Sequence, residues 1–293
     1  MGDEQQNKER DLFGQMVGAT MDAIDGAVDA TKGAFDGAVD ATMGALDGAS
    51  DAFDQVLESL PTFDEVVAQA VRLPGTGVDR SEYLTKALGR KHAPRVVQAA
   101  IDTTPARAGL TQKQIARAAK NSIARDGRRT TALSFAAGIP GGIAGAVTIP
   151  ADMIQFYGYL IRTIQKLTYL YGWRDLVHIE EGTADRAASR ALLVFLGVMG
   201  DVKRADKVFK QLATRRIAGA SDQVLRSMML MGGFDDDLEE ISVELGKKMA
   251  RRLTGQVAGK TVPVVGGIVS GVLTNTGYGD MSKRLLKELQ RYM

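Results

Sequence analysis

The feature that most constrains this chain is an uncharged, glycine-rich run that leads directly into an aromatic segment. No charged side chain occurs from Thr130 to Ala151, which is about the length of a membrane-spanning helix. Pro140 removes a backbone donor in the middle of this run, and the surrounding glycines raise the entropic cost of a helix. We therefore expect a helix that ends near Gly138, a Pro-Gly-Gly corner and a second short helix.

Three environments suit this glycine-rich hairpin. It could be a buried hairpin of a soluble core, a shallow insertion into one leaflet of a bilayer, or a true membrane span. Its small residues would let another helix approach closely, in water or in lipid. The candidate membrane or ligand contacts on the run are Phe135, Ile139, Pro140, Gly141, Gly142, Ile143 and Val147.

The aromatic segment that follows predicts a helix from about Ala151 to Tyr171, with apolar residues over most of its surface. Its polar residues share one stripe, which is either a buried polar seam with a binding role or simply the solvated face. Gly172 is a natural C-cap for this helix, and Trp173 follows it. The stripe contains Tyr159 and our candidate polar seam, which consists of Asp152, Gln155, Arg162 and Lys166.

Several segments of the chain resemble the EcsC family. They are Leu73–Arg80 (LPGTGVDR), Gly138–Gly142 (GIPGG), Ile149–Asp152 (IPAD), Gln165–Trp173 (QKLTYLYGW), Val262–Gly271 and Met281–Arg284. The resemblance spans about Leu60 to the C-terminus, and its pieces occur in the family's order. It implies a bacterial, largely helical protein of unknown biochemical activity, from a family named after a gene beside an ABC-transporter operon and found fused to small GTPases. No catalytic residue follows from it, because the family has none established.

The charges divide the chain into an acidic and a basic part. Residues 1–65 hold 15 acidic and 3 basic residues, whereas residues 66–293 hold 20 and 34, so the net charges are −12 and +14. A basic cluster just before the uncharged run would attract an anionic membrane leaflet. It would also attract nucleic acid, but no nucleic-acid recognition motif accompanies it. The candidate anionic-surface contacts are Lys120, Arg125, Arg128 and Arg129.

The acidic part is an internal repeat with a period of eleven residues, seen in Met21–Thr31, Lys32–Thr42 and Met43–Phe53. Eleven residues make three helical turns, so the pattern stays on one face of a nearly straight helix. Its polar face carries Asp rather than the Lys and Arg that are typical of lipid-surface helices. The repeat is therefore an acidic, partly disordered solubilising tail, a helix that docks on the basic part or on another copy, or a lipid-surface helix.

The remaining sequence favours helices and offers little chemistry. Cysteine is absent and only two histidines occur, so we expect no metal and no cofactor. The polar start predicts a cytoplasmic protein without a signal peptide. The other helices that we expect begin near Thr62, Tyr83, Thr111, Ala187, Lys203, Leu238 and Asp280, and the one near Ala187 is too short to cross a membrane.

We expect an all-α protein, a compact multi-helix domain with glycine-rich helical hairpins, preceded by a long N-terminal amphipathic helix. Its parts are a disordered polar tail (1–12), the acidic repeat helix (13–59) and an EcsC-like helical domain (60–293), in which residues 259–279 pack against residues 138–146.

The leading functional hypothesis is a non-enzymatic accessory or adaptor protein, peripheral to the inner face of the membrane. Its partners would be a lipid surface or a membrane protein, with self-association through residues 13–59 and without nucleic acid. An alternative is a soluble helical module that binds an apolar or lipid ligand between the glycine-rich helices. A third is an enzyme, for which Asp152, Arg162 and Lys166 are the only plausible polar centre.

Overall fold

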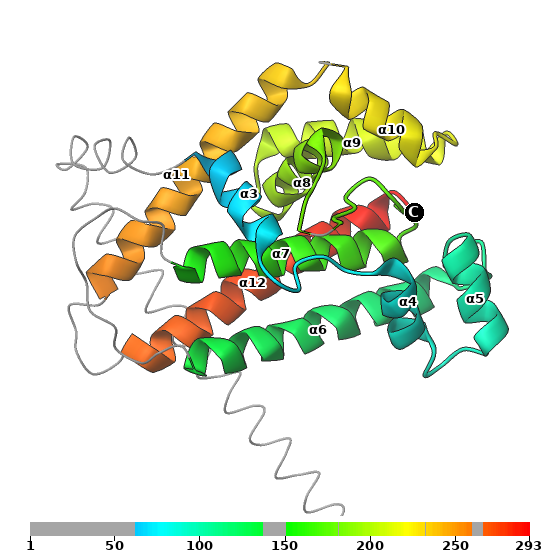
Figure 1. Ribbon diagram of the computed structural model, residues 1–293, viewed down its shortest axis with the longest axis horizontal. Helices are drawn as coiled ribbons and strands as arrows, with labels where there is room; N and C mark the ends of the chain where they lie inside the picture. Colours follow the sequence, from blue (N-terminus) through cyan, green and yellow to red (C-terminus); the bar gives the residue numbers. More distant parts are fainter. Residues whose placement is uncertain (1–61, 137–150, 181, 232, 260–265) are drawn as a thin grey trace, which may run out of the picture. The chain divides into compact units, whose positions relative to one another are not determined.

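The computed structural model describes residues 62–136, 151–180, 182–231, 233–259 and 266–293, all of which belong to a unit that spans residues 55–293. These residues form ten helices and no strand (Figure 1), so the all-α prediction is confirmed for them. The helices are α3 (Phe63–Arg72), α4 (Arg80–Leu88), α5 (Pro94–Asp102), α6 (Gln112–Ala136), α7 (Ala151–Leu170), α8 (Arg186–Met199), α9 (Lys203–Ile217), α10 (Asp222–Leu230), α11 (Asp235–Gly259) and α12 (Gly266–Arg291).

Several predictions fall outside the described residues. The disordered tail (1–12) and the acidic repeat helix (13–59) lie there, as does the Pro-Gly-Gly corner at residues 140–142. The predicted packing of residues 259–279 against residues 138–146 cannot be compared with the structure either, because residues 138–146 lie outside the described residues. These points stay predictions.

Local capping explains where the first helices begin. The Thr62 hydroxyl accepts a hydrogen bond from the backbone N–H of Glu65, whose carboxylate in turn accepts one from the backbone N–H of Thr62. The carboxylate of Asp79 caps α4 in the same way, by accepting from the backbone N–H of Glu82 at 2.6 Å. Thr111 forms the corresponding pair with Gln114 at the start of α6. The predicted starts near Thr62 and Thr111 are therefore confirmed, and α4 starts at Arg80.

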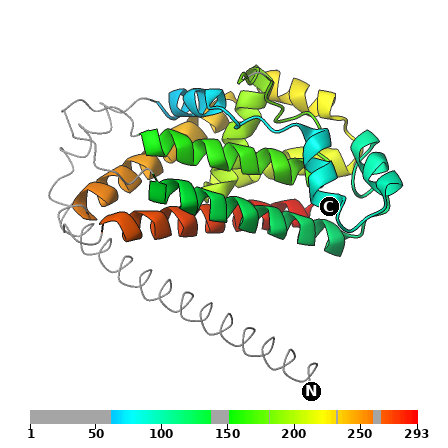
Figure 2. The same ribbon diagram turned by 60° about the horizontal axis from the view of Figure 1, so that its bottom comes forward.

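Helix α7 is the centre of one half of the unit. It packs against α3, α4, α6, α8 and α12. Figure 1 shows it between α3 and the α6–α12 pair, and Figure 2 shows α6, α7 and α12 running alongside one another. The predicted helix at 151–171 is confirmed, and its apolar residues are buried as the pattern indicated. Its end is the predicted cap, because Gly172 has a φ of 83° and the backbone N–H of Trp173 donates to the carbonyl of Thr168.

Helix α8 is the centre of the other half. It packs against α9, α10, α11 and α12, and every residue from Ala191 to Met199 is buried. The prediction of a short core helix near Ala187 is therefore confirmed. Within the described ranges, no helix has both the length and the apolar character needed to cross a bilayer.

Two helices differ in extent from the sequence prediction. The helix that starts near Thr111 and the helix expected to end near Gly138 are one helix, α6, which runs from Gln112 to Ala136 because no proline interrupts it and its Arg-rich turn favours a helix. Helix α12 begins at Gly266 and not at Asp280, so Asp280 lies inside a helix and not at its cap. Packing of α12 along α6 stabilises this longer helix despite its glycines. Helix propensity alone does not include such packing.

Gly197 provides a direct test of the packing between α8 and its neighbours. A Cβ atom at this position would lie 2.4 Å from the Cβ of Ala205 and 3.0 Å from the Cγ2 of Ile241. We expect Gly197→Ala to lower the free energy of unfolding by about 1–3 kcal/mol, because α9 must shift away from α8. Urea unfolding measures this change. Gly246→Ala is the matched control, because nothing lies within 4 Å of its Cβ position; there the helix propensity of alanine should leave stability unchanged or raised. An equal loss in both variants would contradict the close packing.

Candidate functional site

A pocket of about 400 Å³ lies where the loop after α3 meets one side of α7. The two elements are far apart in the sequence, and each contributes about half of the wall. One further residue comes from α6. The lining residues are Leu73, Pro74, Gly75, Thr76, Asp126, Gln155, Gly158, Tyr159 and Arg162.

A buried glutamine on α7 holds the loop in place. The side-chain amide of Gln165 accepts a hydrogen bond from the backbone N–H of Val78 at 3.1 Å and donates one to the carbonyl of Thr76 at 2.8 Å. The Tyr169 hydroxyl donates to the carbonyl of Val78 at 3.3 Å, and burial raises the pKa of that phenol to about 12. Two segments that the sequence showed separately, Leu73–Arg80 and Gln165–Trp173, are therefore in contact.

Gly158 allows the loop to approach α7 closely. A Cβ atom there would lie 3.1 Å from the Cδ1 of Leu73 and 3.3 Å from the Oγ1 of Thr76. The Thr76 hydroxyl is itself fixed, because it donates to the carbonyl of Ala70 at 3.0 Å. This part of the pocket wall is therefore closely packed, and its threonine already has a hydrogen-bond partner.

The polar groups at the pocket come from one stripe of α7. Gln155 is exposed, whereas Tyr159 and Arg162 are half-buried. One guanidinium nitrogen of Arg162 donates to the carbonyl of Gly75, which joins helix and loop. Burial raises the pKa of Tyr159, and the nearby charge of Arg162 opposes that shift in part, so the phenol stays protonated at neutral pH.

An ion pair lies behind this stripe. The ammonium group of Lys166 on α7 bonds to the carboxylate of Asp126 on α6, and the two side chains are only 8% and 10% exposed. The Lys166 nitrogen also lies 5.9 Å from the centre of the Tyr83 ring. Asp126 was not among the site residues predicted from the sequence. The available signal was that Asp126 is the one acidic residue between Gln112 and Ala136, on an otherwise basic helix.

Further hydroxyl groups are buried near this pair. The Thr163 hydroxyl and the Tyr278 hydroxyl are hydrogen-bonded at 2.7 Å, which joins α7 to α12. Burial raises the pKa of Tyr83 and of Tyr278 well above the ordinary value of a phenol. Both phenols therefore remain neutral across the physiological range.

The structure places the predicted polar seam as follows. Gln155 and Arg162 line the pocket, and Lys166 is buried against the Asp126 carboxylate. The stripe is thus solvated at Gln155 and buried at Lys166, and a binding role for it stays a prediction. Asp152 belongs to α7, but its side chain lies outside the described part, so the polar centre proposed for an enzyme is only partly visible.

The predicted membrane contacts are mostly outside the described residues. Ile139, Pro140, Gly141, Gly142, Ile143 and Val147 all lie there, and Phe135 is seen only as part of the backbone of α6. Of the predicted anionic-surface contacts, Lys120 and Arg125 are exposed on α6, and Arg128 and Arg129 are described by backbone alone.

The exposed cations extend further than the sequence analysis proposed. Between residues 86 and 125 the chain has nine Lys or Arg residues and one acidic residue, Asp102. We call this segment the basic stretch. All nine cations are exposed: Lys86, Arg90, Lys91, Arg95, Arg107, Lys113, Arg117, Lys120 and Arg125. Among the described residues, Lys86 is the one of these nine that forms an ion pair.

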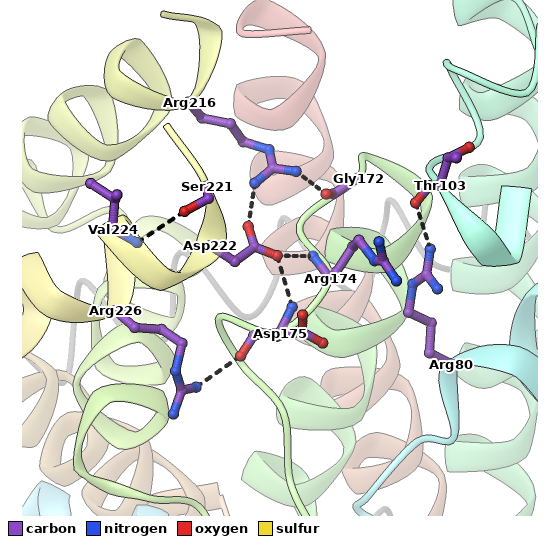
Figure 3. Close-up of polar contacts among 10 residues, drawn as sticks. All are labelled: Arg80, Thr103, Gly172, Arg174, Asp175, Arg216, Ser221, Asp222, Val224 and Arg226. Atoms are coloured by element: carbon purple, nitrogen blue, oxygen red, sulfur yellow. Dashed lines mark hydrogen bonds and ion pairs between the residues drawn. The ribbon is translucent and has the colours of Figure 1, made fainter. Parts of the chain in front are cut away.

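The turn after α7 is fixed by charged groups from α9 and α10 (Figure 3). The Asp222 carboxylate accepts hydrogen bonds from the backbone N–H groups of Arg174 at 2.7 Å and of Asp175 at 2.9 Å, and it pairs with Arg216. Arg216 also donates to the carbonyl of Gly172, and its guanidinium lies 5.1 Å from the centre of the Trp173 ring. The whole arrangement holds this turn in place.

His178 is one of the two histidines of the chain and follows the turn after α7. It is exposed, as is Glu180. Within the part of the chain that the structure describes, no group of three His, Asp or Glu side chains is placed to hold a metal ion.

No protein-family model matches this chain, and neither a curated protein nor a solved structure matches it.

Proposed function

We propose that this protein is a non-enzymatic accessory protein that attaches peripherally to an anionic membrane surface, on the cytoplasmic face. The observation that carries the proposal is the basic stretch, with nine exposed cations and one acidic residue between residues 86 and 125. Each Lys or Arg near an anionic leaflet contributes about 1 kcal/mol of attraction, so several together are sufficient for peripheral binding.

The position of the uncharged run supports the same proposal. The basic stretch ends five residues before Thr130, where the charge-free run begins, and α6 carries four of the nine cations and the start of that run. A basic helix that continues into apolar residues is suited to the boundary between headgroups and acyl chains. The glycine-rich hairpin is part of the proposal as an element that inserts shallowly, and the resemblance to the EcsC family agrees with a membrane-linked role.

Flotation with liposomes tests the proposal. We expect the purified protein to float with vesicles that contain phosphatidylglycerol and not with neutral phosphatidylcholine vesicles, and to float less as salt rises. The triple variant Lys113→Glu, Arg117→Glu, Lys120→Glu should bind anionic vesicles about 100-fold more weakly or worse, because three attractive charges become repulsive.

A matched control separates this surface from net charge alone. Lys203, Lys210 and Arg215 are also exposed on a single helix, α9, and none of them forms an ion pair within the described residues. Their triple reversal to Glu changes the net charge of the protein by the same amount. An equal loss of flotation in the two triple variants, or a wild-type protein that never floats, would overturn the proposal. Binding of the wild-type protein to DNA with no flotation would assign the basic stretch to nucleic acid instead.

A further inference from the structure

We propose that the pocket between the Leu73–Thr76 loop and α7 binds a small organic ligand through one monoanionic oxygen group, a carboxylate or a phosphodiester. This assignment does not rest on the membrane proposal, because the pocket and the basic stretch lie on different elements. The one exception is α6, which contributes Asp126 to the pocket.

The charges at the pocket favour a single negative charge on the ligand. Asp126 lines the pocket, but its carboxylate is paired with Lys166, so these two groups balance each other. Among the lining residues that the structure describes, the guanidinium of Arg162 then carries the remaining charge. The second negative charge of a dianion would be repelled by the Asp126 carboxylate, whereas a monoanion neutralises the single positive charge of Arg162.

The hydrogen-bonding groups fit an oxygen anion. One nitrogen of Arg162 is used by the carbonyl of Gly75, and the described residues supply no partner for its other nitrogens. A guanidinium that is held on one side presents its free donors in a fixed direction, which suits carboxylate and phosphate oxygens. Tyr159 and Gln155 add a phenol and an amide one and two turns further along the same face of α7.

The rest of the lining fits a short organic portion. Leu73, Pro74 and Gly158 add apolar surface, and the loop is held rigidly by Gln165. A volume of about 400 Å³ is in the range of small-molecule sites. A preformed wall of this kind avoids much of the ordering cost of binding.

Titration with three soluble probes tests the assignment. Hexanoate carries a carboxylate, glycerophosphoglycerol carries a phosphodiester, and hexanol has no charge. We expect calorimetry or ligand-observed NMR on the full-length protein to detect at least one of the two anions, with hexanol bound at least tenfold more weakly. Absence of binding by both anions up to about 10 mM, or equal binding of hexanol, would overturn the proposal.

Variants at Gln155 place the ligand in this pocket. Gln155 is exposed, so changing its charge leaves the core intact. Gln155→Glu should weaken anion binding about tenfold and Gln155→Lys should strengthen it by a similar factor, since each changes one charge within several ångströms of the site. Gln211→Glu, on exposed α9, is the matched control and should leave affinity unchanged. Affinity that is the same in both Gln155 variants and in wild type would show that the anion binds elsewhere.

A phosphodiester could come from a lipid headgroup or from a free metabolite, and the Gln155 variants distinguish the two sources. If Gln155→Glu weakens both glycerophosphoglycerol binding and flotation with phosphatidylglycerol vesicles, the ligand is a lipid headgroup. If it weakens only the binding of the free compound, the ligand is a soluble molecule. If only the membrane proposal is wrong, the wild-type protein does not float with vesicles but still binds the soluble anionic probe.

Discussion

Replacing Lys166 with methionine should lower the free energy of unfolding by about 3–5 kcal/mol, the largest effect that we expect from a single polar residue in this protein. Lys166 and Asp126 are 8% and 10% exposed, and they join α7 to α6. Methionine fills a similar volume, so the loss arises from a buried carboxylate that no longer has its ammonium partner. Urea unfolding followed by fluorescence of Trp173, the single tryptophan of the chain, measures the change.

Two comparisons make this test specific. Lys86→Met removes a similar ion pair with Glu82, but its partners are 67% and 64% exposed, so it should cost less than about 0.5 kcal/mol. The double variant Lys166→Met, Asp126→Leu should be more stable than Lys166→Met alone, because it also removes the buried carboxylate that has lost its ammonium partner. If Lys166→Met and Lys86→Met cost the same, the buried pair does not stabilise the helix packing.

Replacing Asp222 with alanine should lower the free energy of unfolding by about 2–4 kcal/mol. Its carboxylate accepts bonds from two backbone N–H groups, those of Arg174 and Asp175, and it pairs with Arg216 (Figure 3). Hydrogen bonds to a charged group contribute about 1.5–3 kcal/mol each, and both N–H groups lose their acceptor in the variant. The cost should therefore exceed that of an ordinary cap deletion, which is about 1 kcal/mol.

The fluorescence of Trp173 should change together with the stability. The guanidinium of Arg216 lies 5.1 Å from the ring, and it is held there by Asp222 and by the carbonyl of Gly172. Releasing Arg216 should alter the emission of the folded protein, which an unrelated loss of stability would not do. Asp236→Ala, at an exposed position in the first turn of α11, should cost only a few tenths of a kcal/mol through the helix dipole and leave the emission unchanged. Unchanged emission in Asp222→Ala would contradict the proposed coupling.

The features that could be predicted from the sequence are local ones. The start of α3 follows from Thr62 and Glu65, which are three residues apart, and its buried face follows from the spacing of Phe63, Val66 and Val67. The end of α7 follows from Gly172, because glycine adopts a positive φ at little cost. Each of these depends on neighbours within about one helical turn, and such neighbours can be identified along the chain.

The candidate site depends on partners that are distant in the sequence. The Gln165 amide binds the backbone of a loop 87 residues earlier, and Lys166 pairs with a carboxylate 40 residues earlier. The polar stripe on α7 was visible, but its spacing alone did not show that Lys166 is buried or that Arg162 faces a pocket. A charge on a helix face has the same sequence pattern whether water or another helix covers it.

The sequence by itself determined the helical class of the described part and most of its helix positions. These depend on composition, capping and periodicity, and the free energies involved are local. Only the tertiary structure decided that Asp126 faces Lys166, that Gln165 holds the Leu73–Thr76 loop, and that α12 continues as one helix along α6. Burial makes the difference, because it removes water as an alternative partner, so the free energy of a polar group depends on which distant residue faces it.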